Sequence, residues 1–199
     1  MRFWGLSLLA VVGLASCSKS EPSAGNGRAE IQAGGITWVV LSGRWSKDGE
    51  ALVGSGGRVI SKSDIADGTL DVDVEKAAPS PGEPGIVDVG FRYSLHADDP
   101  GRGNGYELQV KGTTFTVVRG ANSYWQPVQP EIRGFQTSGL LDAKKNHITV
   151  KMVGTSFRLD VHGDSLLAFD DATFAHGRVS LAVESPGETV RFSGFAVGH

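Results

Sequence analysis

Apolar and polar residues alternate with a period of two along most of this 199-residue chain. The clearest stretch is 85–119, where two sets of residues fall on opposite parities: Val87, Val89, Phe91 and Tyr93 against Asp88, Gly90, Arg92 and Ser94. After a polar loop the alternation resumes with Leu108 and Val110 against Glu107, Gln109 and Lys111. A period of two is typical of strands with one buried face. The stretch therefore predicts two neighbouring antiparallel strands.

The same alternation recurs on both sides of this stretch. Its main instances are residues 36–41, 69–75, 146–153, 157–162, 179–183 and 190–192. Residues 164–174 fit either a short strand or a single helical turn. The 28 glycines supply the tight turns that many short strands need. Together these features predict an all-β antiparallel sandwich.

The amino end has the features of a bacterial lipoprotein signal. Arg2 precedes an apolar run from Phe3 to Ala15, which is too short for a membrane-spanning helix. Leu14-Ala15-Ser16-Cys17 resembles a lipobox, and this resemblance implies cleavage before Cys17 and acylation of its sulfur. The alternative is an ordinary signal peptide that ends near a cysteine.

These features predict three segments in the chain. We expect a lipoprotein signal peptide over 1–16, the acylated Cys17 with a flexible tether over 17–33, and one folded domain over 34–199. Ser18 follows Cys17. An Asp at this position would favour retention in an inner membrane, and the chain has Ser there instead. We therefore expect a lipid anchor in the outer membrane of a cell with two membranes.

Charge and cysteine content narrow the possible partners. The formal net charge of −3 and the lack of a basic run argue against nucleic acid as a partner. Cys17 is the single cysteine, so the folded part has no disulfide and no thiolate ligand for a metal. The histidines include no close pair at ligand spacing, so we expect no zinc site.

The polar positions that alternate with the apolar ones in the 85–119 stretch carry an unusual set of side chains. Asp88, Arg92, Glu107 and Gln109 all fall on these positions, whereas a sheet face that only meets water tends to carry Thr, Ser and Lys. Charged and amide side chains on adjacent strands predict a polar floor for a ligand. The alternative is a solvated face with cross-strand charge pairs.

Several motifs occur in the order found in a known family. They are Gly56–Ile60, Leu70–Val74, Gly90–Tyr93, Gly105–Gln109, His147–Val153 and Gly177–Leu181. This part of the chain, about residues 36–197, resembles the 3-keto-disaccharide hydrolase family, and Gly105–Gln109 is the most specific match. The resemblance implies a concanavalin-like, laminin-G-like jelly roll that acts on glycosidic bonds.

The resemblance also implies a reaction in which the residues at these polar positions would take part. A 3-keto sugar has an acidified C2–H, so cleavage by elimination needs a base and a group that holds the enediolate. Glu107 or His96 is the candidate base, and Arg92 is the candidate charge holder. Asp88 and Gln109 are candidate substrate-binding residues.

A second carboxylate motif lies earlier in the chain. Asp71-Val72-Asp73-Val74-Glu75 resembles the alternating carboxylates of family-16 glucanases. Retaining hydrolysis requires carboxyl groups about 5–5.5 Å apart, whereas residues four apart on a strand have Cα atoms about 13 Å apart. A solvated strand face is therefore the favoured interpretation of this motif.

Aromatic residues near polar loops are candidate sugar-binding residues. Tyr106, Tyr124 and Trp125 fit this role because the C–H faces of sugars stack on aromatic rings. The alternative for Trp125 is a core position under a long loop. Asp98–Gly105 has oxygen donors and turn glycines that suit Ca²⁺, although a plain hairpin loop is favoured and we expect no other cofactor.

Three functions fit these observations. The preferred one is a lipid-anchored envelope protein whose jelly roll cleaves glycosidic bonds of 3-keto disaccharides or other glycosides. The second is a lectin-like module that binds carbohydrate without chemistry. The third is a structural envelope lipoprotein that binds protein partners, and the sequence alone does not separate the three.

Overall fold

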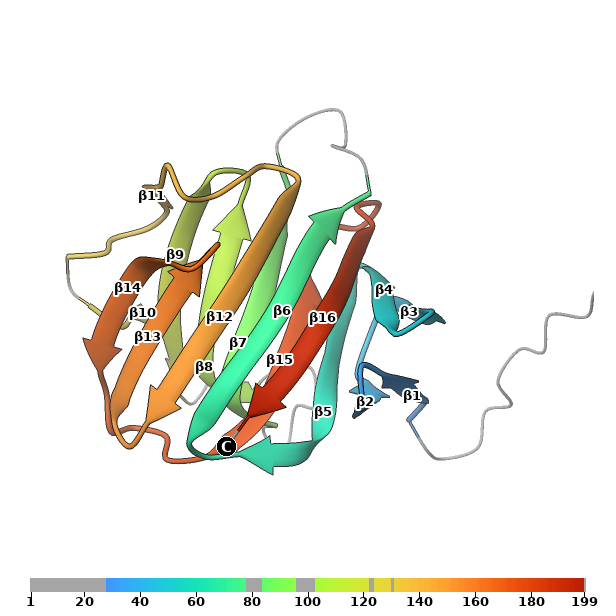
Figure 1. Ribbon diagram of the computed structural model, residues 1–199, viewed down its shortest axis with the longest axis horizontal. Helices are drawn as coiled ribbons and strands as arrows, with labels where there is room; N and C mark the ends of the chain where they lie inside the picture. Colours follow the sequence, from blue (N-terminus) through green and yellow to red (C-terminus); the bar gives the residue numbers. More distant parts are fainter. Residues whose placement is uncertain (1–27, 78–83, 96–102, 122–123, 130, 199) are drawn as a thin grey trace, which may run out of the picture.

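Two antiparallel β-sheets pack face to face in this protein, as the computed structural model shows (Figure 1). The structure describes residues 28–77, 84–95, 103–121, 124–129 and 131–198. These described residues contain strands and turns, and none of them forms a helix able to cross a membrane.

The larger sheet, sheet A, has nine strands in the order β1-β2-β5-β15-β7-β8-β9-β10, and β11 also pairs with β9. Its strands are β1 (Glu30–Ala33), β2 (Ile36–Val40), β5 (Gly57–Ile65), β7 (Ile86–Leu95), β8 (Gly103–Lys111), β9 (Thr114–Ala121), β10 (Tyr124–Pro127), β11 (Gln136–Thr137) and β15 (Gly177–Val183). The predicted pair of strands is β7 and β8, which lie side by side.

The smaller sheet, sheet B, has seven strands in the order β14-β13-β12-β6-β16-β4-β3. Its strands are β3 (Arg44–Asp48), β4 (Ala51–Ser55), β6 (Gly68–Lys76), β12 (Lys145–Val153), β13 (Ser156–Val161), β14 (Asp164–Asp170) and β16 (Val190–Gly198). Sheet B lies in front of sheet A in Figure 1, so its outer face is turned to the viewer.

The core fills the space between the two inner faces. Sheet A contributes Val89, Phe91, Leu108, Val117 and Leu181, and sheet B contributes Leu70, Val72, Ile148, Leu159 and Phe192. At one end, the rings of Phe91, Tyr106, Phe157 and Phe169 pack with centroid distances of 4.7 to 5.9 Å. Aromatic rings bury a large apolar area each, so this group closes that end of the sandwich.

The two-sheet architecture confirms the predicted all-β antiparallel sandwich. Residues 164–170 form strand β14, so the strand alternative holds there rather than the helical turn. The sheet begins at Glu30, before the expected start of the domain at residue 34, because residues 30–33 pair with β2. Gly34 and Gly35, with φ of +57° and +73°, form the two-residue turn that this hairpin requires.

Candidate functional site

A compact group of polar side chains lies on the outer face of sheet A, which points away from sheet B. We call it the acid cluster; its members are Arg58, Asp88, Glu107, Ser180 and Glu184. Strand pairing assembles it, because Ala182 of β15 lies beside both Arg58 of β5 and Asp88 of β7. Asp88 and Ser180 are fully buried and Glu107 is 1% exposed, although all three lie on an outer face.

One guanidinium group holds the acid cluster together. Arg58 Nη1 donates to Glu107 Oε1 at 2.5 Å and to Ser180 Oγ at 2.8 Å. Its Nη2 donates to Asp88 Oδ2 at 3.2 Å and to Glu184 Oε1 at 3.5 Å. The ring of Tyr93 covers the guanidinium, with its centroid 5.0 Å from Cζ, in a cation–π contact. A single cation therefore serves three carboxyl groups.

Two buried acids, Asp88 and Glu107, share one cation with Glu184, whose side chain is half exposed. Burial raises the pKa of Asp88 well above its usual range, and the charges of Glu107 and Glu184 raise it further against the effect of Arg58. Burial also raises the pKa of Glu107, although its bonds to Arg58 oppose the shift. Asp88 Oδ1 has no hydrogen-bond partner among the described residues.

A β-bulge in β7 reverses the expected orientation of two residues. The pairing of β7 with β8 shifts by one residue between Phe91 and Ser94, and Arg92 has a φ of +47°. An extra residue in a strand moves the following side chains to the opposite face. Tyr93, expected in the core, therefore joins the outer face, while Arg92 turns inward. The expectation that Arg92 shares a face with Glu107 is wrong for this reason.

Arg92 instead ties together three connections at one end of the sandwich. Its Nε and Nη1 donate to the carbonyl oxygens of Ala66, Gly154 and Phe174 at 2.7 to 3.1 Å. Its Nη2 donates to Asp67 at 2.9 Å, and the Phe157 ring lies 4.8 Å from its Cζ. Arg92 is 1% exposed, so its side chain has a structural role rather than that of a charge holder for a ligand.

The second feature of this outer face is a line of residues that crosses the strands near one end. Register places Trp125 beside Gly120, Gly120 beside Gly105, and Arg178 between Tyr93 and Asp64. We call this line the cross-strand row; its members are Trp125, Gly120, Gly105, Tyr93, Arg178 and Asp64. It runs over β10, β9, β8, β7, β15 and β5 in turn.

Trp125 forms one end of the cross-strand row. Its ring lies directly over Gly120, where a Cβ atom would stand only 2.7 Å from the ring carbons. A residue with any side chain at position 120 would therefore displace the ring. Trp125 is 39% exposed, so its ring rests on the backbone of β9 and remains open to solvent.

A hollow of about 510 Å³ lies at the other end of the cross-strand row. It is lined by Asp64, Tyr93, Ser94, Leu95, Thr173, Phe174, Ala175, His176, Gly177 and Arg178. We call it the Arg178 hollow. Tyr93 belongs both to its lining and to the cover of Arg58, so the acid cluster supports one wall of the hollow.

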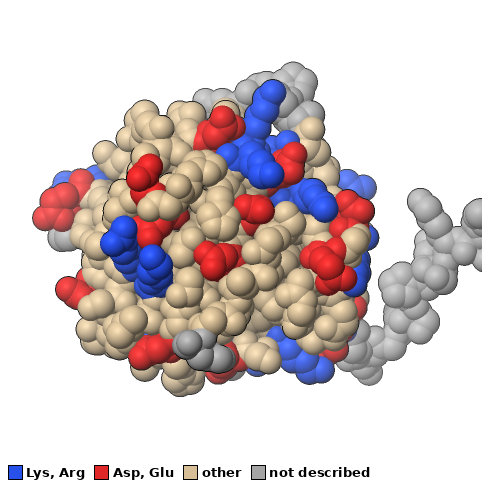
Figure 2. Space-filling model, in the orientation of Figure 1, with Lys and Arg blue, Asp and Glu red and all other residues tan. Residues whose placement is uncertain are grey.

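The alternating carboxylates Asp71, Asp73 and Glu75 lie on β6, on the outer face of sheet B. His147 Nδ1 lies 2.8 Å from Asp73 Oδ1, and the Thr149 hydroxyl donates to Asp71. Acidic and basic residues are interspersed over this face (Figure 2). The motif therefore lies on a solvated strand face with cross-strand partners, in agreement with the favoured interpretation.

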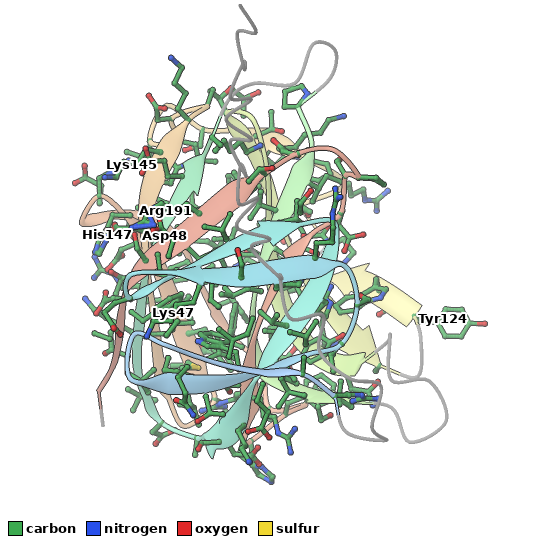
Figure 3. All side chains as sticks on the ribbon, turned by 90° about the vertical axis from the view of Figure 1, so that its right-hand side faces the viewer. Lys47, Asp48, Tyr124, Lys145, His147 and Arg191 are labelled. Carbon is green, nitrogen blue, oxygen red and sulfur yellow. The ribbon has the colours of Figure 1, made fainter. Side chains whose placement is uncertain are left out.

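The other predicted ligand-binding residues have separate positions. Gln109 shares the outer face of sheet A with Asp88 and Glu107 and donates to Glu107 at 3.4 Å. Tyr106 is fully buried in the core, where its hydroxyl donates to Asp171 at 2.8 Å, so the expectation that it faces a sugar is wrong. Tyr124 is 76% exposed and projects away from the body of the protein (Figure 3).

The remaining candidates lie wholly or partly outside the described residues. His96 is one of them, as is most of the candidate Ca²⁺ loop Asp98–Gly105, of which only residues 103–105 are described. Within the described part of the chain, no group of three His, Cys, Asp or Glu side chains is arranged to hold a metal. Cys17 and the lipobox also precede the first described residue.

Sequence reasoning missed two arginines on this face, Arg58 and Arg178. Arg58 lies in the Gly56–Ile60 motif, directly before the apolar pair Val59-Ile60. This position on a buried strand is the sequence feature that could have identified it as a site residue. Two acids on adjacent buried strands need a cation, and an arginine on another buried strand is the natural source. No local pattern identifies Arg178, because its place beside Tyr93 depends on the bulge in β7.

Comparison with known proteins supports the fold. No protein-family model and no curated protein matches the sequence. A carbohydrate binding module, CBM66 from Bacillus subtilis, has a TM-score of 0.62 at 19% identity, over 81% of this chain and 95% of the module. A putative glycosyl hydrolase from Parabacteroides distasonis has a TM-score of 0.56 at 14% identity, over 80% of this chain and 98% of the other.

A third structure is the β-glucanase of Bacillus licheniformis, with a TM-score of 0.55 at 12% identity, over 86% of this chain and 97% of the glucanase. The protein therefore has the concanavalin-like jelly-roll fold of these three structures. Identities this low establish the fold alone, and the resemblance to 3-keto-disaccharide hydrolases stays a prediction.

Proposed function

We propose that the protein binds carbohydrate on the outer face of sheet A, along the cross-strand row. The observation that supports this proposal is the row itself, which has a solvent-open Trp125 at one end and the Arg178 hollow at the other. Adjacent strands lie about 4.8 Å apart, so four strand steps from β10 to β15 span about 19 Å. That length suits an extended glycan of several sugar units.

The chemistry of the row fits a sugar. An indole ring offers an apolar surface for the C–H face of a pyranose, and charged and hydroxyl side chains pair with its hydroxyl groups. Gly105 adds no side chain between Gly120, which the Trp125 ring covers, and Tyr93. The named carbohydrate binding module with the same fold adds support for this choice of ligand.

Cleavage of glycosidic bonds, including those of 3-keto glycosides, is the second candidate function. The acid cluster favours it, because two neighbouring carboxyl groups whose pKa values are both raised are the kind of pair that serves as base and acid. Binding is preferred because Asp88 and Glu107 are 0% and 1% exposed and Arg58 occupies the Glu107 carboxylate. A glycan on the face would contact neither of these carboxyl groups directly.

Calorimetry on a panel of glycans tests the binding proposal. Trp125→Ala should lower affinity by about tenfold or more, because the loss of one stacking contact costs roughly 1.4 kcal/mol. Tyr124→Ala is the matched control, since Tyr124 is an exposed aromatic neighbour that points away from the sheet. Equal effects of the two substitutions, or no binding of any glycan by the folded wild type, would refute the proposal.

Product release from the same panel tests cleavage. If the acid cluster is catalytic, Glu107→Gln should reduce turnover by about 10² or more, because the substitution removes the base. A binding module shows no turnover in the wild type with any keto or ordinary glycoside. Measured turnover that Glu107→Gln abolishes would replace the binding proposal by the enzymatic one.

We also propose that Cys17 anchors the protein to a membrane of the bacterial envelope, on the basis of the lipobox Leu14–Cys17. The anchor would present the jelly roll at the periplasmic or outer surface, where glycans are accessible. Cys17→Ser should abolish lipid labelling and release the protein from membranes. Unchanged membrane fractionation of this variant would contradict the proposal.

A further inference from the structure

The Arg178 hollow contains an arginine whose outer nitrogens are not used within the described protein. Arg178 donates from Nε to Asp64 Oδ1 at 3.3 Å, and neither of its terminal nitrogens donates a hydrogen bond to a described residue. The side chain is 37% exposed. Its free donors are therefore available to a molecule in the hollow.

The acceptor capacity of the hollow is largely occupied. Both oxygens of Asp64 already have partners, because Oδ1 accepts from Arg178 and Oδ2 lies 3.4 Å from His176 Nδ1. The titratable side chains of the lining are Asp64, Tyr93, His176 and Arg178. Burial raises the pKa of Tyr93 to about 12, so this residue adds no charge at neutral pH. Among these side chains, Arg178 has terminal nitrogens that donate to no residue in the described part of the chain.

We propose that the Arg178 hollow binds the carboxylate of an acidic sugar, such as a uronic acid unit of the bound glycan. This inference rests on the proposed carbohydrate-binding function and names the substrate class. A guanidinium group presents parallel N–H donors that match the two oxygens of a carboxylate. Asp64 accepts from Nε and fixes the orientation of the fork, and Ser94 and Thr173 belong to the same lining.

The position of the hollow at the end of the cross-strand row favours this ligand. A glycan stacked on Trp125 and extended across the strands reaches Arg178 after four strand steps. Its carboxylate would then meet the one guanidinium of the row, whereas Arg58 lies beneath Tyr93 with its own acid partners. Trp125 would supply affinity for the chain, and Arg178 would select for the acid.

The test compares free acids with their neutral esters on the full-length chain. The probes are oligogalacturonate and oligoglucuronate, each measured by calorimetry beside the same oligosaccharide with its carboxyl groups methyl-esterified. We expect wild type to bind a free acid at least about tenfold more tightly than its ester. Arg178→Gln should abolish this preference while leaving affinity for the ester nearly unchanged.

A matched control exists on the other sheet. Arg191 of β16 donates to Asp48 at 3.0 Å and is 38% exposed, so it forms a similar arginine–aspartate pair outside the hollow (Figure 3). Arg191→Gln should keep the preference for the acid. Asp64→Asn is a second variant that removes the competing carboxylate, and it should increase the preference by about two- to fivefold.

The outcomes separate this inference from the proposed function. The inference is overturned if wild type binds acid and ester with equal affinity, or if Arg178→Gln keeps the preference for the acid. In either case the proposed function stands as long as glycan binding depends on Trp125. Binding of no glycan overturns both. A sulfated oligosaccharide bound more tightly than the matching uronate would assign the hollow to sulfate esters and overturn the choice of carboxylate.

Discussion

Asp88 on sheet A and Asp160 on sheet B occupy similar positions and have opposite electrostatics. Each aspartate lies on the outer face of its sheet, and the two are 0% and 2% exposed. Burial raises the pKa of Asp88, and neighbouring acids raise it further. Burial also acts to raise the pKa of Asp160, but hydrogen bonds from Arg158 and Lys151 outweigh it and lower this pKa.

The two carboxyl groups also differ in the number of cations that contact them. Arg58 is shared among Asp88, Glu107 and Glu184. Asp160 alone receives Lys151 Nζ at 3.2 Å and Arg158 Nε at 2.6 Å. Burial acts to raise the pKa of both carboxyl groups, and only at Asp160 do the hydrogen bonds from cations outweigh it.

Solvent access adds a second contrast between the two faces. The side chain of Arg58 is 10% exposed, whereas those of Lys151 and Arg158 are each 51% exposed. Ion pairs with exposed partners contribute little to stability, while removal of one partner from a buried pair is costly. Perturbation of the acid cluster should therefore change stability far more than perturbation of the Asp160 group.

The largest effect is expected from removal of the cation on each face. Arg58→Ala leaves Asp88 and Glu107 buried without a counter-charge and should destabilise the fold by about 3–5 kcal/mol. Arg158→Ala leaves Asp160 with Lys151 and should cost about 1 kcal/mol or less. Denaturant unfolding at pH 7 measures both values. Equal losses would show that the two faces do not differ as described.

If Arg58→Ala does not fold at neutral pH, unfolding is measured again near pH 4–5. Protonation of Asp88 and Glu107 would then remove the unpaired charges, so partial recovery of the fold is expected. A variant that remains unfolded at both pH values would point to lost packing rather than lost charge.

Asp88→Asn tests whether the pKa of Asp88 is raised in the folded protein. A carboxyl group whose folded pKa lies above its unfolded value binds protons more tightly in the folded state, so stability falls as pH rises from about 4 through the folded pKa. Replacement by Asn removes this loss. We expect the variant to be about 1 kcal/mol more stable than wild type at pH 8, with no gain at pH 4. A lower stability at pH 8 would contradict a raised pKa of Asp88.

The alternation of residues was sufficient to predict the fold. Strands β6, β7, β8 and β12 appear where apolar and polar residues exchange every second position, because one face of each strand packs in the core. The sequence predicts that residues 30–33 belong to the tether, because four residues with little apolar mass show no clear period. Their pairing with β2 depends on the Gly34-Gly35 turn.

The site was only partly predictable. The alternation of residues correctly predicted that Asp88, Glu107 and Gln109 share one face. It failed in β7 beyond Phe91, because a single bulge residue moves the following side chains of this strand to the opposite face. No sequence signal marks the bulge, since Arg92 is a non-glycine residue at positive φ that tertiary contacts hold in place. The sheet order that brings Arg58 to these acids is likewise set by long-range pairing.

Asp160→Asn is the counterpart of Asp88→Asn on sheet B. A carboxyl group with a lowered folded pKa contributes stability above its unfolded pKa near 4, and this contribution is lost as pH falls. The variant should be about 1 kcal/mol less stable than wild type at pH 7, and the difference should vanish near pH 2. Chemical denaturation across this range measures it. A constant difference at all pH values would mean that the charge of Asp160 has no part in stability.

The smallest effect should distinguish burial from charge as the cause of the Asp88 shift. Glu184 adds a negative charge to the acid cluster, and this charge raises the pKa of Asp88. Glu184→Gln removes that charge and offers an amide donor to the unpartnered Oδ1 of Asp88. Its side chain is 50% exposed, so we expect a gain of only about 0.5 kcal/mol at pH 8.

The pH dependence of the stability of Glu184→Gln distinguishes the two causes, burial and the charge of Glu184. If charge contributes to the shift, the fall in stability with rising pH should begin at lower pH than in wild type and be smaller in size. If burial alone raises the pKa, Glu184→Gln should leave the pH profile of unfolding unchanged, because it exposes no part of Asp88. Unfolding measured from pH 4 to 9 for wild type, Glu184→Gln and Asp88→Asn separates these cases, with Asp88→Asn defining the profile that lacks the shifted proton.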